Sequence, residues 1–111
     1  MDAILEKIDK DLYALVIDII GFLKTLQKKG VENQATATLA KLTSTLNKKF
    51  NNFYENKGQK DEIKKIAGSL IEQIKFILIK NFEDIDRSII HEKADLLIQA
   101  DELQKYIEKN L

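Results

Sequence analysis

Hydrophobic residues near the start of the chain recur at alternating steps of three and four. The series consists of Leu5, Ile8, Leu12, Leu15, Ile19, Phe22 and Leu26. This spacing is typical of a helix whose apolar seam packs against other helices. A second apolar strip, formed by Val16, Ile20 and Leu23, lies beside the seam. The first helix therefore has more apolar surface than one bundle interior needs, and we expect this strip to form an interface between copies of the chain.

The same kind of periodicity predicts three further helices. The four helices are expected over about residues 3–29, 32–57, 61–80 and 88–110. In the last three, the core positions are predicted to be Ala35, Leu39, Leu42, Leu46, Phe50 and Phe53, then Ile63, Ile66, Ala67, Leu70, Ile74, Ile77 and Leu78, and finally Ile89, Leu96, Ala100, Leu103 and Ile107, with Ile90, Ala94 and Leu97 on an adjoining strip.

Turn and cap residues separate these helices. Gly30 and Gly58 each follow a lysine, and glycine readily takes the left-handed conformation that ends a helix. Asp61 and Ser88 are predicted N-caps, and residues 81–86 are predicted to form the third turn. Four helices joined by short turns predict an all-α fold, an antiparallel up-down-up-down four-helix bundle that forms a single domain over residues 1–111.

Composition narrows the class of protein. The chain has 111 residues with no cysteine and no proline. Without cysteine there is no disulfide framework and no thiolate chemistry, which fits the reducing cytoplasm, our expected location. The longest apolar run, residues 12–23, contains Asp18 and is about twelve residues long, whereas a membrane span needs about twenty. We therefore expect no membrane partner, and nothing in the composition requires a cofactor.

Charge is balanced overall but unevenly distributed. The 18 basic and 18 acidic residues give a formal net charge of zero. Between residues 41 and 65, seven lysines face three acids, whereas residues 83–111 contain eight acids and four bases. The molecule is thus expected to have a basic end and an acidic strip, and complementary faces of this kind could pair between copies.

Residues with catalytic or metal-binding chemistry are sparse. The single histidine, His91, has Glu92 beside it and Asp95 one helical turn later, which could weakly hold a metal or tune a proton acceptor. Ser88 occupies the position three residues before His91, so the Glu-x-x-His pattern of di-metal bundles is absent. An exposed histidine in a charged helix explains the pattern as well. We therefore expect neither enzyme activity nor a metal site.

Glu72 lies among apolar residues of the third predicted helix, with Gly68 one turn earlier. A carboxylate near a helix interface needs a partner, which Lys65, Lys75 or a lysine of another helix could supply. A plain exposed glutamate is the alternative.

The third predicted helix also carries a resemblance to a known family. Its sequence over residues 66–74, Ile-Ala-Gly-Ser-Leu-Ile-Glu-Gln-Ile, follows the charged residues 61–65, Asp-Glu-Ile-Lys-Lys. Asn51, Asn52, Glu55 and Gly58 precede it in an asparagine-rich, glutamate-containing turn. This arrangement resembles the bacterial four-helix-bundle proteins of the 23S rRNA intervening-sequence type, which are related to accessory proteins of diversity-generating retroelements.

The resemblance implies a small, non-catalytic bundle that forms rings or other homo-oligomers and associates with nucleic acid. By analogy, the nucleic-acid-binding residues would be Lys48, Lys49, Lys57, Lys60, Lys64 and Lys65, with Phe53 and Tyr54 as stacking groups for RNA or DNA bases. The alternative is that these lysines only keep one end of the bundle soluble. This alternative is supported by the net charge of zero, because phosphate binding normally needs a net basic surface.

A second hypothesis comes from the residues alone. The extra apolar strip of the first helix would let the chain act as a scaffold that binds a partner protein. The sequence leaves both hypotheses open.

Overall fold

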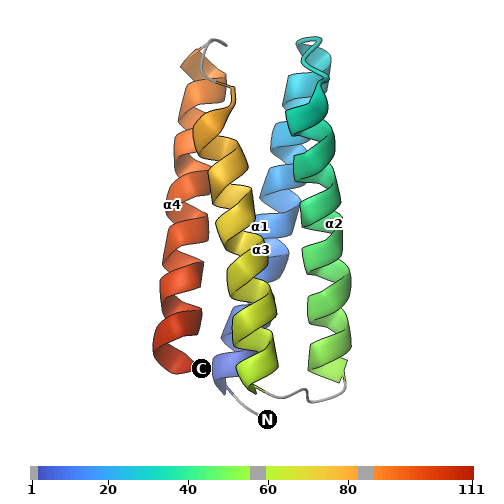
Figure 1. Cartoon of the computed structure of the whole chain (residues 1–111). Helices are drawn as coiled ribbons and strands as arrows, with labels where there is room; N and C mark the ends of the chain where they lie inside the picture. Colours follow the sequence, from blue (N-terminus) through green and yellow to red (C-terminus); the bar gives the residue numbers. More distant parts are fainter. Residues whose placement is uncertain (1–2, 56–59, 83–86) are drawn as a thin grey trace.

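The computed structural model describes residues 3–55, 60–82 and 87–111, and of residues 51–55 it describes only the backbone. Four helices occupy these ranges: α1 (Ala3–Lys28), α2 (Gln34–Glu55), α3 (Lys60–Lys80) and α4 (Arg87–Asn110) (Figure 1). Within the described ranges there is no strand. The fold is therefore all-α, as predicted, and each helix end lies within two residues of its predicted position.

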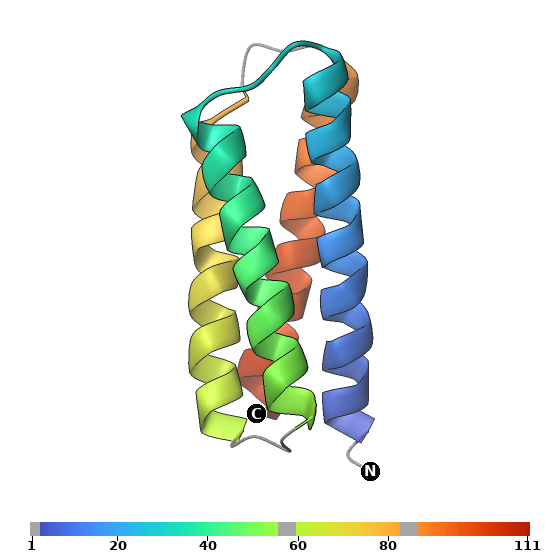
Figure 2. The same cartoon turned by 90° about the vertical axis from the view of Figure 1, so that its right-hand side faces the viewer.

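The four helices pack side by side in a square. α1 packs against α2 and α4, and α3 packs against the same two helices. Figures 1 and 2 show the end of α1, the start of α2, the end of α3 and the start of α4 together at one end of the molecule. The particle is elongated, with principal extents of 43 × 21 × 19 Å. The α1–α4 side and the α2–α3 side are consequently opposite faces of the bundle.

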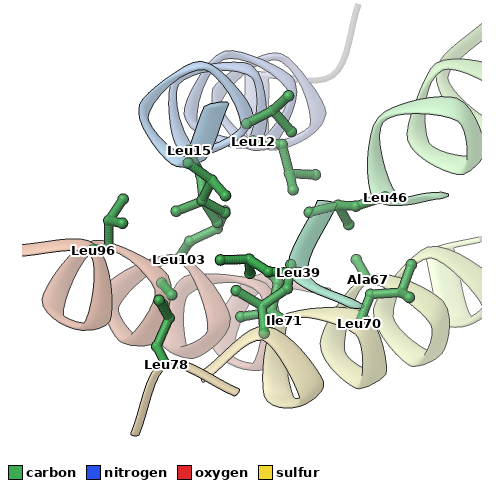
Figure 3. Close-up of a cluster of buried hydrophobic side chains, with 14 of the residues drawn as sticks. Leu12, Leu15, Leu39, Leu46, Ala67, Leu70, Ile71, Leu78, Leu96 and Leu103 are labelled. Carbon is green, nitrogen blue, oxygen red and sulfur yellow. The ribbon is translucent and has the colours of Figure 1, made fainter. Parts of the chain in front are cut away.

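The core runs along the middle of this square. Buried leucines of all four helices, among them Leu15 of α1, Leu39 of α2, Leu78 of α3 and Leu103 of α4, point into one interior (Figure 3). The predicted seam of α1 is confirmed from Ile8 to Leu26, and its first member, Leu5, is half-buried against the core. The remaining predicted core positions with described side chains are buried, or half-buried against the core, whereas on the adjoining strip of α4 only Leu97 is half-buried and Ile90 and Ala94 are exposed. The residues that the pattern missed are Val16, Thr43, Ile71 and Phe82.

The end of α1 follows from local sequence. Gly30 has a φ of 76°, and the N–H groups of Gly30 and Val31 donate to the carbonyls of Gln27 and Leu26 at 3.0 and 2.9 Å. These two bonds define a Schellman motif, so the predicted glycine cap is confirmed. Asn33 then caps α2, because its Oδ1 accepts from the Thr36 N–H at 3.1 Å while Thr36 Oγ1 accepts from the Asn33 N–H at 2.9 Å.

The other predicted caps differ from the structure. α3 begins at Lys60 and α4 at Arg87, so Asp61 and Ser88 lie inside the first helical turn and not before it. A carboxylate in a first turn still interacts favourably with the positive end of the helix dipole, which explains why Asp61 suits its position. The predicted cap at Gly58 lies outside the described residues.

The end of α3 has an unusual backbone. Phe82, two residues after the helix, has a φ of 67° although it is not a glycine. Its side chain is only 6% exposed and meets the ring of Phe22 edge to face, with 5.6 Å between the centroids. The Lys93 ammonium of α4 donates to the Asn81 carbonyl at 3.0 Å. Contacts with α1 and α4 therefore hold this turn in place.

Candidate functional site

The three residues predicted to form an interface on α1 lie in different environments. Val16 is buried among the residues that α1 packs against α2, with 5% exposure. Leu23 is half-buried against the core, and Ile20 is 39% exposed. The expectation that Val16 lies on a free surface is corrected, because a helix between two neighbours buries a wider face than one seam. Ile20 remains available on the surface of this chain.

The exposed apolar stripe of α1 instead consists of Tyr13, Ile17 and Ile20, which are 63%, 48% and 39% exposed. These positions are four and three residues apart, so they lie along one side of the helix. Of these three residues, the sequence pattern predicted only Ile20 as part of an exposed strip.

Two other helices also expose large apolar side chains. On α3, Phe76 is 59% exposed and Ile79 is 50% exposed. On α4, Ile90 and Ile98 are 43% and 59% exposed. Phe76 borders a shallow hollow on the α2–α3 face together with Thr38, Leu42 and Ile77. The Lys80 ammonium lies 5.9 Å from the centroid of the Phe76 ring. Phe76 and Lys80 together make an aromatic projection with a cation beside it.

A groove lies on the opposite face, between α1 and α4. It has a volume of about 520 Å³. We call it the α1–α4 groove, and it is lined by Ile17, Asp18, Gly21, Phe22, Thr25, Glu92, Asp95, Leu96 and Gln99. Three of these residues are acidic and none is basic. The groove therefore combines apolar side chains with negative charge.

The carboxylates of this groove have no ionic partner among the residues that the structure describes. Asp18, Glu92 and Asp95 are exposed, and none of them forms an ion pair with another residue that the structure describes. Nearer the other end of the same α1–α4 seam, by contrast, the Lys7 ammonium donates to the Asp11 carboxylate at 2.7 Å. This hydrogen bond raises the pKa of Lys7. The three carboxylates are thus free to meet cations of another molecule.

A polar network joins α3 to α4. The Lys75 ammonium, with its side chain 17% exposed, donates to Asp101 Oδ1 at 2.9 Å and to Gln104 Oε1 at 2.7 Å. Gln104 in turn donates to Glu72 Oε2 at 2.8 Å. The expectation that Glu72 has a lysine partner is met by Lys75, whose Nζ lies 3.7 Å away. This network uses the polar groups of α3 and α4 to connect the two helices.

Asp101 is the anion at the centre of this network. Hydrogen bonds from Lys105 and then Lys75 lower the pKa of its carboxyl, and the same contact with Asp101 raises the pKa of Lys105. Both shifts favour the charged forms that the ion pairs need. The network therefore has a structural role in the alignment of α3 and α4.

Five of the six lysines predicted to bind nucleic acid lie toward the end of the bundle where α2 ends and α3 begins. Lys48 and Lys49 lie near the end of α2, and Lys60, Lys64 and Lys65 lie at the start of α3; all five are exposed. The end of α2 and the start of α3 lie together in Figure 1. We call these five residues the lysine end. Asp61 and Glu62 are exposed between them, while Lys57 and the side chains of Phe53 and Tyr54 lie outside the described residues.

The histidine cluster gains no metal site from the fold. Across the described ranges, no three histidine, cysteine, aspartate or glutamate side chains come together as metal ligands. His91 is exposed, and Glu92 and Asp95 border the α1–α4 groove.

No helix in the described ranges is both long and apolar enough to cross a bilayer.

Comparisons of the chain with protein-family profiles, curated proteins and solved structures find no match. The resemblance to the intervening-sequence family therefore stays a prediction from the sequence. The surfaces described above carry the functional argument.

Proposed function

We propose that the protein is a non-catalytic helical bundle that assembles with further copies of itself. The observation that supports this proposal is the set of seven large apolar side chains that are 39–63% exposed on α1, α3 and α4. Apolar area gains about 25 cal/mol for each Å² that is removed from water. Burial of these side chains between copies therefore stabilises the assembly relative to the isolated chain.

We also infer that the bundle is an antiparallel one with up-down-up-down topology. The end of each helix and the start of the next lie at the same end of the molecule in Figures 1 and 2. Short connections between such ends favour neighbouring helices of opposite direction. If copies of such a bundle lie side by side and point in the same direction, equivalent faces of all copies are at the same height along the bundle axis.

The test is light scattering coupled to size exclusion, on the unmodified chain at several concentrations and two salt concentrations. The expected result is a mass that is an integer multiple of the 12.8 kDa chain. Apolar contacts should persist at the higher salt concentration, because salt screens charges but does not weaken burial. A mass of one chain at every concentration would contradict the proposal.

Nucleic-acid association is a second candidate, and it is favoured by the lysine end. Five exposed lysines face two acids in the described part of this region. Assembly would strengthen the local positive charge, because side-by-side copies with the same direction place several lysine ends around one rim. Each phosphate that a lysine neutralises makes binding weaker as salt rises, with a slope of about 0.7–0.9 on logarithmic axes.

Fluorescence anisotropy with a short labelled RNA, and with DNA of the same sequence, tests this candidate. Replacing Lys48, Lys49, Lys64 and Lys65 by glutamine should reduce binding and flatten its salt dependence. Replacing Lys24 and Lys28 is the matched control and should change little. These two lysines are exposed near the end of α1, at the opposite end of the bundle from the lysine end. Binding that is equal at 50 and 200 mM salt would count against the candidate.

A further inference from the structure

Opposite faces of this bundle carry different features: one has an exposed aromatic ring with a cation beside it, and the other has a groove lined by acidic side chains. The α1–α4 face contains a groove with three exposed carboxylates, and the α2–α3 face carries the exposed Phe76 ring with the Lys80 ammonium beside it. Since each helix packs only on its two neighbours in the square, these faces point in opposite directions. One chain thus presents a projection and a hollow that cannot meet each other.

Gly21 adds no side chain to the groove. It is exposed in the second half of α1 and lines the α1–α4 groove. A Cβ added at this position would meet nothing within 4 Å. Glycine weakens a helix relative to alanine, and neither φ nor packing inside the chain requires glycine here. The missing side chain leaves room for an atom that comes from outside the chain.

The two features also lie at similar heights along the bundle. Phe76 is four residues before the end of α3, and Gly21 is seven residues before the end of α1. At 1.5 Å per residue these positions are about 6 and 10 Å from the two helix ends. Those ends lie together at one end of the molecule in Figure 1. The difference is less than one helical turn, so a copy with the same direction brings Phe76 level with the groove.

We propose that Phe76 of one copy inserts into the α1–α4 groove of the next copy, with Lys80 facing the groove carboxylates. This inference rests on the proposed self-assembly and names its contact surfaces. Charge complementarity selects a second copy as the occupant, because Asp18, Glu92 and Asp95 form no ion pair in the described part of the chain and Lys80 lies beside the ring. Glu72, the acid on the Phe76 face, is already held by Gln104 and Lys75.

Such a contact joins two different surfaces, so it is heterologous. Repeating it rotates each copy by the same angle, which closes a ring or continues as a filament. Every copy then keeps one projection and one groove engaged. A variant that loses its projection still offers a groove, and a variant with a blocked groove still offers a projection.

Mixing two variants tests this arrangement directly. Phe76→Gln removes the projection, and Gly21→Leu fills the groove with a side chain that suits a helix. Each variant alone is expected to self-associate at least tenfold more weakly than the unmodified chain. An equimolar mixture is expected to form a heterodimer of twice the chain mass, because one intact projection then meets one intact groove. Ile98→Gln is the comparison variant, since Ile98 is as exposed as Phe76, at 59%, and does not line the groove, so its loss should weaken self-association less than Phe76→Gln does.

The possible results separate this inference from the proposed function. A monomeric unmodified chain overturns both. An oligomer that neither Phe76→Gln nor Gly21→Leu weakens overturns the inference and leaves self-assembly in place. Two monomeric variants that do not combine on mixing also overturn it, because a contact between identical surfaces behaves in that way. Circular dichroism and thermal melting of each variant verify that the fold is intact, and Gly21→Leu is expected to melt higher than the unmodified chain.

Discussion

The chain takes a left-handed backbone conformation after both α1 and α3, but with very different residues. Gly30 follows α1 with a φ of 76°, and Phe82 follows α3 with a φ of 67°. Gly30 is exposed, and a Cβ there would meet nothing within 4 Å. Phe82 is buried against Phe22. One turn is therefore formed by a residue that tolerates the conformation, and the other by a residue whose side chain gains enough from burial to offset the strain.

The comparison shows two ways of ending a helix. A bulky residue in the left-handed region costs about 1–2 kcal/mol. Full burial of a phenylalanine side chain contributes about 1.5–3 kcal/mol. Burial thus outweighs strain at Phe82, but only while α1 supplies Phe22 and α4 supplies the Lys93 ammonium. The end of α1 depends on its own residues, whereas the end of α3 depends on the assembled bundle.

Replacing Phe82 by alanine should have the largest effect on this comparison. The substitution removes the ring from the core and keeps the backbone strain, so we expect the free energy of unfolding to fall by about 3 kcal/mol. Urea denaturation followed by circular dichroism measures the change.

The matched variant Phe82→Gly separates burial from strain. It creates the same cavity but relaxes the backbone, and should therefore be about 1 kcal/mol more stable than Phe82→Ala. If the glycine variant were instead the less stable of the two, strain at this position would be negligible.

Replacing Gly30 by alanine should have a smaller effect, a loss of about 1 kcal/mol in the free energy of unfolding. The Cβ has open space, so the cost comes only from the left-handed backbone. Gly30→Asn serves as the control and should lose less, because asparagine tolerates this region better than alanine. Equal stability of the alanine variant and the unmodified chain would mean that the φ of 76° is not required.

Lys93→Met removes the donor that α4 provides to the end of α3. One hydrogen bond, from Nζ to the Asn81 carbonyl at 3.0 Å, is lost, so we expect a fall of about 1 kcal/mol in the free energy of unfolding. Combining Lys93→Met with Phe82→Ala tests whether the two residues stabilise the same turn. A combined loss smaller than the sum shows that they act on one unit, and strict additivity argues for independent roles.

The smallest effect is expected at Asp101, which connects α3 to α4 away from this turn. Its carboxyl pKa is lowered by Lys105 and Lys75, so the ion pairs stabilise the fold above the unfolded pKa of about 3.9. This stability is lost as pH falls through the lower folded pKa. In Asp101→Asn the decline in the free energy of unfolding as pH falls below about 4 should be shallower. An identical acid decline in both proteins would show that the Asp101 pairs contribute nothing measurable.

The helix pattern could be predicted from the sequence because it depends on local periodicity and cap residues. The α1 seam and the Gly30 cap are examples. Phe82 could not be predicted as a core residue, since it lies beyond the helix and faces inward only through a left-handed backbone. Val16 was assigned to the surface because a periodic pattern does not reveal how many neighbours a helix has. Ile71 was missed for the same reason on α3.

The candidate surfaces were only partly accessible from sequence. The lysine end was visible as a run of charges, and Ile20 as part of an apolar strip. The α1–α4 groove joins residues more than 60 positions apart, and no local pattern in either segment indicates that they meet. Phe76 lies among apolar residues of α3, so its exposure became evident only when the packing partners of that helix were known.

The square arrangement has a consequence for how the chain folds. Three of its four helix pairs, α1 with α2, α2 with α3 and α3 with α4, are neighbours in sequence. Only the α1–α4 seam closes a loop that spans nearly the whole chain, and long loops are slower and entropically more costly to close. We expect α4 to dock on α1 late in folding. At high concentration this seam is where two chains would exchange helices, giving domain-swapped dimers that dissociate only on unfolding.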